Sequence, residues 1–288
     1  MSRARGCDHL FYNFANKHRC DFSRERTSDV LIPCMKIMRS MALLVSLAWL
    51  PVLASTVAAA PVYELRTYTS PPGKLDALLT RFRDHTCKLF EKHGMRNIGY
   101  WVPMDEKDGT KNTLIYFLAH DSRDAAKKSW ENFMNDPEWK KVRSTSEAGG
   151  SIVSKVESVF FAPTDYSPDF QPSFAMNPRV FELRTYTAAP GKLAALDARF
   201  RGGETELFAR AGMNGLVYLH PMDAAQGAGT TLVYLLAHQS RSAAEKSWQA
   251  FRDDPDWIKM RDESEADGKL VAKVQSVFLK PTDFSQTE

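Results

Sequence analysis

The stretch VYELRTYTSPPGKLDALLTRFR at residues 62–83 returns almost unchanged at residues 180–201 as VFELRTYTAAPGKLAALDARFR. The shift of 118 residues that superimposes these stretches also aligns residues 62–166 with residues 180–284 without a gap. A period of this length is far above the roughly 20–50 residues of a solenoid repeat, so it indicates a duplicated domain.

The short motifs shared by the two copies keep one order along the chain. After ELRTYT come PGKL, PMD, AH-SR, KSW, DP-W, SVF and PTD. Between the copies, SPDFQPSFAMNP contains three prolines and little periodicity, which is typical of a linker. The sequence therefore predicts a first repeat at residues 61–166, a linker at 167–178 and a second repeat at 179–288.

Each repeat shows the same succession of strand and helix signals. In the first repeat, alternation, apolar spacing and capping residues define the elements. They are a strand at 62–69, a helix at 74–93, strands at 99–104 and 114–120, helices after the caps Ser122 and Asp136, and a strand at 153–161. The order βαββαβ is that of the ferredoxin-like fold, an α+β unit with helices on one face of a four-stranded antiparallel sheet.

A single unit of this kind would leave the other face of its sheet open, with a large apolar area exposed. Two units can cover each other by packing sheet to sheet. The sequence therefore predicts an intrachain pseudo-dimeric α/β barrel, a monomer whose second copy covers the first, and leaves a higher oligomer open.

The first 60 residues have a different character from the repeats. Lys36 and Arg39 precede an apolar run at residues 41–54, and an A-x-A signal ends at Ala60. This pattern predicts a signal peptide at residues 35–60, cleaved near Ala60, and a secreted or periplasmic protein. The run is shorter than the about 20 residues of a membrane helix, so no stable membrane span is expected after cleavage.

Residues 1–34 are a doubtful extension, because a signal peptide normally starts close to its basic residues. Translation from Met1, Met35 or Met38 is left open. The alternative is a mitochondrial transit peptide, since MSRARG is rich in arginine. Four acidic residues in this extension argue against it, because transit peptides are poor in acids.

Removing residues 1–60 changes the charge and the cysteine content. Thirty basic and 31 acidic residues remain, so no nucleic-acid footprint is expected. Cys87 is then the one cysteine left, which excludes an internal disulfide and a thiolate metal site. No metal site and no cofactor are predicted, with haem kept as a weaker alternative. The partner expected is a small molecule.

The ELRTYT strands carry charges at alternate positions. Because alternate residues of a strand share a face, Glu64, Arg66 and Tyr68 lie together and Leu65 lies opposite. Packing of Leu65 under the helices would point the charged face toward the space between the sheets. The equivalent residues of the second repeat are Glu182, Arg184 and Tyr186. Two interpretations stay open, a structural ion pair in each half or arginines that bind an anionic or carbonyl group.

His120 and His238 end a strand just before a helix cap, on the same face as Tyr116 and Tyr234. Each histidine is either a neutral side chain bonded to its surroundings or a general base or axial haem ligand. The two histidines are the candidate catalytic residues, and the two tyrosines join the candidate ligand-binding residues.

The whole pattern resembles the NIPSNAP family, within the wider group of dimeric α/β-barrel proteins. The resemblance rests on YELRTYT and FELRTYT, PGKL, NTLIYFLAHDSR and TTLVYLLAHQSR, and DPEWKKV and DPDWIKM. It implies the barrel fold, and a group that includes cofactor-free monooxygenases, haem-degrading enzymes and ligand binders. Asn112 is also a candidate ligand-binding residue, and Thr230 replaces it in the second repeat.

Three functions follow as hypotheses. The favoured one is a secreted protein that binds a small aromatic or anionic molecule between the two sheets. The alternatives are a cofactor-free monooxygenase or haem-binding or haem-degrading enzyme, and a non-catalytic interaction module. Whether the chain is an enzyme is left open. A hollow space between the sheets would favour the first hypothesis, and a filled interior the last.

Overall fold

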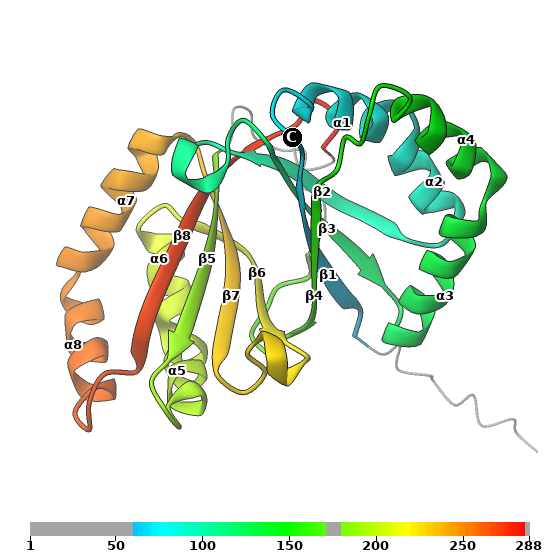
Figure 1. Cartoon of the computed structure of the whole chain (residues 1–288). Helices are drawn as coiled ribbons and strands as arrows, with labels where there is room; N and C mark the ends of the chain where they lie inside the picture. The colour runs from blue at the N-terminus through cyan, green and yellow to red at the C-terminus, as the bar shows by residue number, and fades with distance from the viewer. Residues whose placement is uncertain (1–59, 171–179, 286–288) are drawn as a thin grey trace, which may run out of the picture. The chain divides into compact units, whose positions relative to one another are not determined.

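The computed structural model describes residues 60–170 and 180–285. The predicted extension at 1–34, nearly all of the predicted signal peptide and most of the predicted linker lie outside the described residues. Two series of elements, related by the sequence repeat, make up the described part (Figure 1).

The elements of the first repeat are β1 Val62–Thr69, α1 Leu75–Arg81, the π-helical turn η1 Phe82–Thr86, α2 Cys87–Lys92, β2 Arg96–Pro103, the 3-10 turn η2 Glu106–Asp108, β3 Thr113–His120, α3 Arg123–Asn135, α4 Pro137–Ser146 and β4 Lys155–Pro163. Those of the second are β5 Val180–Ala188, α5 Leu193–Arg199, η3 Phe200–Glu204, α6 Thr205–Arg210, β6 Asn214–Pro221, η4 Ala224–Gln226, β7 Thr231–His238, α7 Arg241–Asp253, α8 Pro255–Ser264 and β8 Val271–Pro281.

The predicted succession of elements is confirmed, with one difference in the first helix. The helix expected at residues 74–93 is interrupted by the π-helical turn η1, and η3 interrupts its counterpart in the second repeat. The two predicted caps are present, since Ser122 accepts a hydrogen bond from the amide of Ala125 and Asp136 accepts one from the amide of Glu138.

The eight strands form one closed antiparallel barrel in the order β1-β3-β2-β8-β5-β7-β6-β4. Within each repeat the sheet has the ferredoxin-like order, with β1 or β5 between its two neighbours. Two short ladders join the repeats, β2 with β8 at residues 101–103 and β4 with β6 at residues 161–163. The fold class is therefore confirmed as a pseudo-dimeric α/β barrel.

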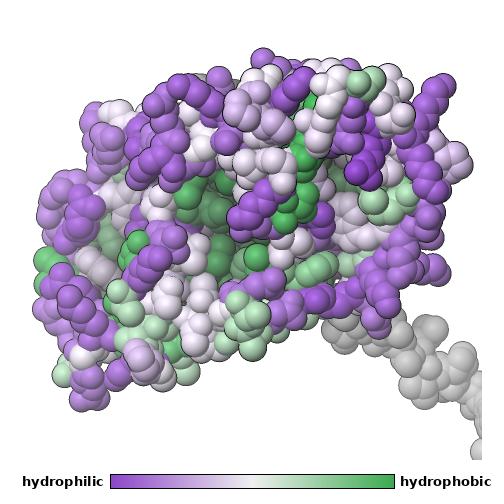
Figure 2. Space-filling view, viewed as in Figure 1, coloured by the Kyte–Doolittle hydropathy of each residue, from purple (hydrophilic) through white to green (hydrophobic). Residues whose placement is uncertain are grey.

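The barrel interior is filled by hydrophobic side chains from both repeats. Trp101 and Phe181 meet there with their ring centroids 5.5 Å apart, and both are fully buried. Phe170, at the start of the predicted linker, is also buried and packs against Tyr63 and Phe117. Figure 2 shows hydrophobic residues recessed between hydrophilic surfaces. Two further apolar clusters lie between the outer face of the barrel and the helices.

The segment after the last strand of each repeat crosses to the other repeat. After β8, Ser285 accepts a hydrogen bond from the amide of Tyr100, and Phe284 packs on the Tyr100 ring at 5.4 Å. After β4, Ser167 accepts one from the amide of Tyr218, and Tyr166 packs on Tyr218 at 5.7 Å. These reciprocal arms account for the repeated PTD motif at the end of each copy.

The repeated PMD and AH-SR motifs also meet across the repeats. Arg123 Nη1 lies 3.0 Å from Asp223, and Arg241 Nη1 lies 3.1 Å from Asp105. The two guanidinium groups also lie over Phe160 and Phe278, at 4.1 Å and 3.9 Å. Each repeat therefore contributes one arginine and one aspartate to the contact.

No helix among residues 60–170 and 180–285 is both long and apolar enough to cross a membrane.

Candidate functional site

The charged side chains of the ELRTYT strands face the helices, and not the space inside the barrel. Leu65 packs in the barrel interior, whereas Tyr68 belongs to the apolar cluster under the helices. The predicted alternation is confirmed, but the face assigned to each set was wrong. The physical reason is that the closed barrel needs an apolar interior, while polar partners for Glu64 are available on the helix side.

Glu64 is the centre of a hydrogen-bonded cluster in the first repeat. Its side chain is 1% exposed. Trp130 of α3 donates its indole N–H to Glu64 Oε2 at 2.8 Å, and Ser158 of β4 donates its hydroxyl to Oε1 at 2.6 Å. Arg66 Nη1 donates to Glu64 Oε1 at 2.6 Å, and the Arg66 guanidinium lies over the Trp130 ring, 4.1 Å from its centroid. The carboxylate thereby connects β1, β4 and α3.

These contacts keep Glu64 ionised. Burial by itself would raise the pKa of Glu64, but the bond from His120, the charge of Arg66 and the bonds from Ser158 and Trp130 together lower it to about 2. A carboxylate saturated with donors is held in its charged form. Arg66 keeps its charge as well, because Tyr116, Tyr68 and Glu64 outweigh the effect of burial and raise its pKa.

The second repeat reproduces the cluster with nearly the same geometry. Trp248 donates to Glu182 Oε2 at 2.7 Å, Ser276 donates to Oε1 at 2.6 Å, and Arg184 Nη1 donates to Oε1 at 2.5 Å. The pKa of Glu182 is lowered to about 2 by the same kinds of contact, against the effect of burial. Each glutamate thus contacts an arginine, a histidine, a serine and a tryptophan, and the presence of this arrangement in both repeats indicates a structural role for both glutamates.

His120 and His238 belong to these clusters. His120 Nε2 lies 3.0 Å from Glu64 Oε2, and His238 Nε2 lies 3.2 Å from Glu182 Oε2. Both side chains have an exposed fraction of 0%. Axial ligation of haem requires a free imidazole nitrogen that faces a large cavity. The Nδ1 atom of each ring has no hydrogen-bond partner among the described residues, but both side chains are fully buried, and the pocket that His238 lines has a volume of about 230 Å³. This space does not fit haem, and haem binding stays an untested prediction.

Of the remaining candidates, the tyrosines join the clusters and Asn112 does not. Arg184 Nε donates to the Tyr234 hydroxyl at 2.9 Å, and Tyr116 lies on the same helix side of the first repeat. The Tyr68 hydroxyl accepts a hydrogen bond from Arg66 Nη2 at 3.3 Å. The Tyr186 hydroxyl accepts one from Arg184 Nη2 at the same distance. Asn112 lies in the turn before β3, where its side chain accepts a bond from the Thr113 hydroxyl.

A pocket lies beside each cluster, between the barrel and the helices. The pocket of the second repeat has a volume of about 510 Å³. It is lined by Glu182, Arg184, Tyr186, Arg241, Glu245, Trp248, Phe251, Arg252, Trp257, Ser276 and Phe278. The pocket of the first repeat has a volume of about 280 Å³. It is lined by Arg66, Tyr68, Phe82, Thr86, Phe90, Trp130, Phe133, Met134 and Trp139.

Two differences between these pockets were missed by the sequence reasoning. Arg252 in the second pocket corresponds to Met134 in the first, and the buried Glu204 corresponds to Thr86. Burial raises the pKa of Glu204 to about 7, against the opposing charges of Arg199 and Arg184. The alignment at a shift of 118 residues contains both substitutions, but it does not show that Met134, Thr86 and Arg252 line pockets or that Glu204 is buried.

Comparison with known proteins identifies the family. The NIPSNAP family model matches residues 63–168 and again residues 181–286, which together are more than half of the chain. The chain therefore belongs to the NIPSNAP family. No match was found among curated protein sequences.

Three solved structures illustrate the similarity. A NIPSNAP domain protein from Burkholderia xenovorans is 25% identical, with 38% of this chain and 99% of that chain covered and a TM-score of 0.33. A NIPSNAP family protein of unknown function from Agrobacterium tumefaciens is 23% identical, with 38% and 93% covered and a TM-score of 0.33. An anthrone oxidase-like protein is 16% identical, with 79% and 94% covered and a TM-score of 0.48. Since these TM-scores are below 0.5, function is argued from the site itself.

Proposed function

We propose that the protein binds a small, flat aromatic anion in the pocket of the second repeat, between the barrel and helices α7 and α8. The observation that carries the proposal is a pocket of about 510 Å³ with aromatic walls and arginines among its lining residues. This volume is within the range of roughly 300–1,000 Å³ that is usual for small-molecule sites. The ligand position differs from the inter-sheet space predicted from the sequence, because hydrophobic side chains fill the barrel interior.

The aromatic preference follows from the walls. Trp248, Trp257 and Phe278 line the pocket. A guanidinium group lies over each ring, at 4.1, 4.9 and 3.9 Å, so a ligand ring would contact the remaining faces and edges of these side chains. Such contacts contribute about 0.5–1.5 kcal/mol each beyond burial of apolar area. A rigid ring system also loses little conformational entropy when it binds.

The preference for an anion follows from Arg252. Arg184 is paired with Glu182, and Arg241 with Asp105, so the charges of these two arginines are already balanced. Arg252 forms no ion pair with the described residues, and its Nη2 donates to the Gln249 side chain at 2.8 Å. The remaining guanidinium donors are therefore available to an anionic group on a ligand.

The test is isothermal titration with 1-naphthalenesulfonate, a rigid two-ring anion, and with neutral 1-naphthol for comparison. Arg252→Met is expected to weaken naphthalenesulfonate binding about tenfold, which corresponds to about 1.4 kcal/mol for a lost charge-assisted bond. Met134→Arg, the reverse change in the first repeat, is the matched control and is expected to leave this affinity unchanged.

A second pair of variants tests the aromatic wall. Phe278→Leu is expected to weaken both probes, and Phe160→Leu, at the equivalent position of the first repeat, is expected to have no effect on either. The proposal is wrong if neither probe binds, or if Arg252→Met and Phe278→Leu both bind naphthalenesulfonate as the natural chain does.

Export is a second part of the proposal, supported by the basic, apolar and A-x-A segments that end at Ala60. Expression of the full chain in a bacterial host with a secretion system is expected to give an extracytoplasmic protein that begins at Pro61. Determination of the N-terminal sequence from each cell fraction checks this. A protein that retains its first 60 residues in the cytoplasm would contradict it.

A further inference from the structure

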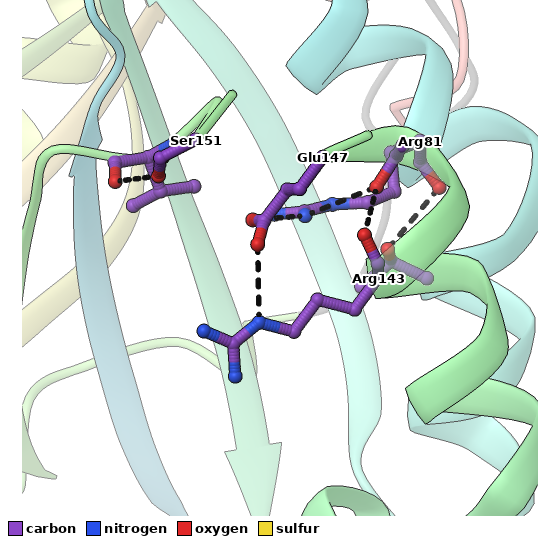
Figure 3. Close-up of polar contacts among 7 residues, drawn as sticks. Arg81, Arg143, Glu147 and Ser151 are labelled. Atoms are coloured by element: carbon purple, nitrogen blue, oxygen red, sulfur yellow. Dashed lines mark hydrogen bonds and ion pairs between the residues drawn. The ribbon is translucent and has the colours of Figure 1, made fainter. Parts of the chain in front are cut away.

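The equivalent buried arginines Arg81 and Arg199 have different hydrogen-bond partners in the two repeats. In the second repeat, Arg199 Nε donates to Glu204 Oε2 at 2.8 Å, and Nη1 lies 3.2 Å from Glu265. In the first repeat, Arg81 Nη1 donates to Glu147 at 2.9 Å, and Figure 3 shows Glu147 between Arg81 and Arg143. The Nε atom of Arg81 is buried and has no hydrogen-bond partner among the described residues.

A second pair of arginines shows the same asymmetry. Arg184 Nε donates to the Tyr234 hydroxyl at 2.9 Å. Arg66 Nε, its counterpart in the first repeat, is buried without a partner in the described part of the chain. Their side chains are 3% and 15% exposed, for Arg81 and Arg66 respectively. A buried donor without an acceptor costs about 1–3 kcal/mol, so two of them in one region call for an explanation.

For Arg81 the explanation is a missing carboxylate, since Glu204 Oε2 accepts the Nε–H bond of its counterpart Arg199. For Arg66 the counterpart Arg184 donates to Tyr234, and the equivalent Tyr116 hydroxyl is also without a partner among the described residues. Glu204 is fully buried in the second repeat and is close enough to Arg199 and Arg184 for both charges to act on it. The first repeat has Thr86 at this position. The Thr86 side chain is too short to reach the guanidinium groups, and its hydroxyl donates to the backbone oxygen of Arg81 at 3.1 Å.

A cavity lies where the carboxylate is missing. Thr86 and Arg66 both line the first-repeat pocket of about 280 Å³. Trp139 also lines this pocket, and the Arg81 guanidinium lies 5.2 Å from the Trp139 ring. Thr86, which stands at the position of Glu204, thus faces an aromatic-walled space, with Arg66 among its lining residues and Arg81 next to the Trp139 wall. The volume is enough for a small carboxylate.

We propose that the first-repeat pocket binds a small monocarboxylate, whose carboxylate group takes the place that the Glu204 side chain occupies in the second repeat. The carboxylate accepts a hydrogen bond from the Nε–H group of Arg81, as Glu204 does from Arg199, and the positive charge of Arg66 acts on it as that of Arg184 acts on Glu204. The hydrocarbon part of the ligand packs against aromatic walls such as Trp130 and Phe90. This site is separate from the second-repeat pocket and does not depend on ligand binding there.

The internal repeat also indicates why the group is a carboxylate. The equivalent position in the same fold holds a glutamate, so a planar anion with one charge matches the space and the donors. Arg66, Arg81 and Arg143 carry three positive charges beside the two carboxylates of Glu64 and Glu147, so one further negative charge balances the group and a dianionic phosphate would exceed it. Burial of such an unbalanced charge is costly.

The experiment uses 4,4,4-trifluorobutyrate, a monocarboxylate without a ring for the aromatic walls of the second-repeat pocket, as the probe and fluorine NMR as the readout, with the full chain and three variants. The natural chain is expected to bind one equivalent in the first repeat. Thr86→Glu supplies the carboxylate from within the chain and is expected to weaken binding at least tenfold. Glu204→Thr opens the equivalent site in the second repeat and is expected to add a second binding site.

The double variant Thr86→Glu, Glu204→Thr is the matched control, because it retains both residue types and moves the site to the second repeat. It is expected to bind one equivalent. Unchanged binding by Thr86→Glu would overturn the proposal, and so would the absence of any added site in Glu204→Thr. If Thr86→Glu does not fold, the result for Glu204→Thr decides alone.

Binding of 1-naphthalenesulfonate to Thr86→Glu separates this proposal from the function proposed above. Unchanged naphthalenesulfonate binding together with lost trifluorobutyrate binding shows two independent sites. Loss of both ligands would show that the substitution disturbs the whole domain, and the monocarboxylate site would then be rejected in its present form.

Discussion

Replacement of Glu64 by glutamine removes the charge at the centre of the first cluster and nearly preserves the side-chain volume. The pKa of Glu64 is about 2 in the folded chain against an ordinary value of 4.5. A tenfold change in acid dissociation corresponds to about 1.4 kcal/mol, so ionisation of Glu64 stabilises the fold by about 3 kcal/mol at neutral pH. Because the folded-state pKa is the lower one, this contribution is complete above pH 4.5 and is lost as the pH falls through 2.

The pH dependence distinguishes this mechanism from simple loss of packing. About 2 of the 3 kcal/mol are already lost between pH 7 and pH 3 in the natural chain. The destabilisation by Glu64→Gln, measured against the natural chain, is therefore expected to be about 2 kcal/mol smaller at pH 3 than at pH 7. Urea unfolding followed by tryptophan fluorescence at both pH values provides the measurement.

Two control variants accompany this measurement. Glu182→Gln is expected to behave like Glu64→Gln, since its cluster has the same geometry and its pKa is also lowered to about 2. Glu157→Gln changes a carboxylate with 54% exposure on β4 and is expected to shift stability by less than about 0.5 kcal/mol. Equal destabilisation by Glu64→Gln at pH 3 and pH 7 would refute the argument.

Three other predictions concern the contacts between the repeats. Phe170→Ala should destabilise the fold by about 3–5 kcal/mol, because it removes a buried ring from the barrel interior, and thermal unfolding measures the loss. A double-mutant cycle on Arg241 and Asp105 should give a coupling of less than about 1 kcal/mol, because both side chains are about one-third exposed. Truncation after Pro281 should lower the melting temperature and expose Tyr100, which faster hydrogen exchange at its amide would show, and unchanged exchange would contradict the arm contact.

The sequence predicted the fold well because the evidence is repeated and local. Alternation in residues 62–69, the caps Ser122 and Asp136 and the breaks at glycine and proline depend on nearest neighbours, and they occur twice. The duplication also indicated that one sheet covers the other. The π-helical turns were not predicted, since a one-residue insertion in helical hydrogen bonding leaves the apolar spacing of such a short helix almost unchanged.

The site was predicted in its members but not in its location. Glu64, Arg66, Tyr68 and His120 do lie together, as their strand positions implied. The face that they occupy depends on which side of the sheet closes into the barrel, and a change of face reverses every side chain. The hydrogen bond from the Trp130 indole to Glu64 was not predicted, because apolar periodicity does not reveal a bond to a glutamate on a distant strand.

The significance of the difference between Thr86 and Glu204 could not be predicted from the sequence. A threonine and a glutamate on a helix are both ordinary at exposed positions, and the sequence does not show that these two are buried. Their significance depends on arginines that lie five residues away in the chain and on another strand.

The most direct test of ligand binding on the helix side of the barrel is a crystal structure of the protein grown with 1-naphthalenesulfonate. Electron density for the two rings against Trp248 and Phe278, with the sulfonate at Arg252, is the predicted result. Density for the probe among the interior strands, next to Trp101 and Phe181, would contradict the account.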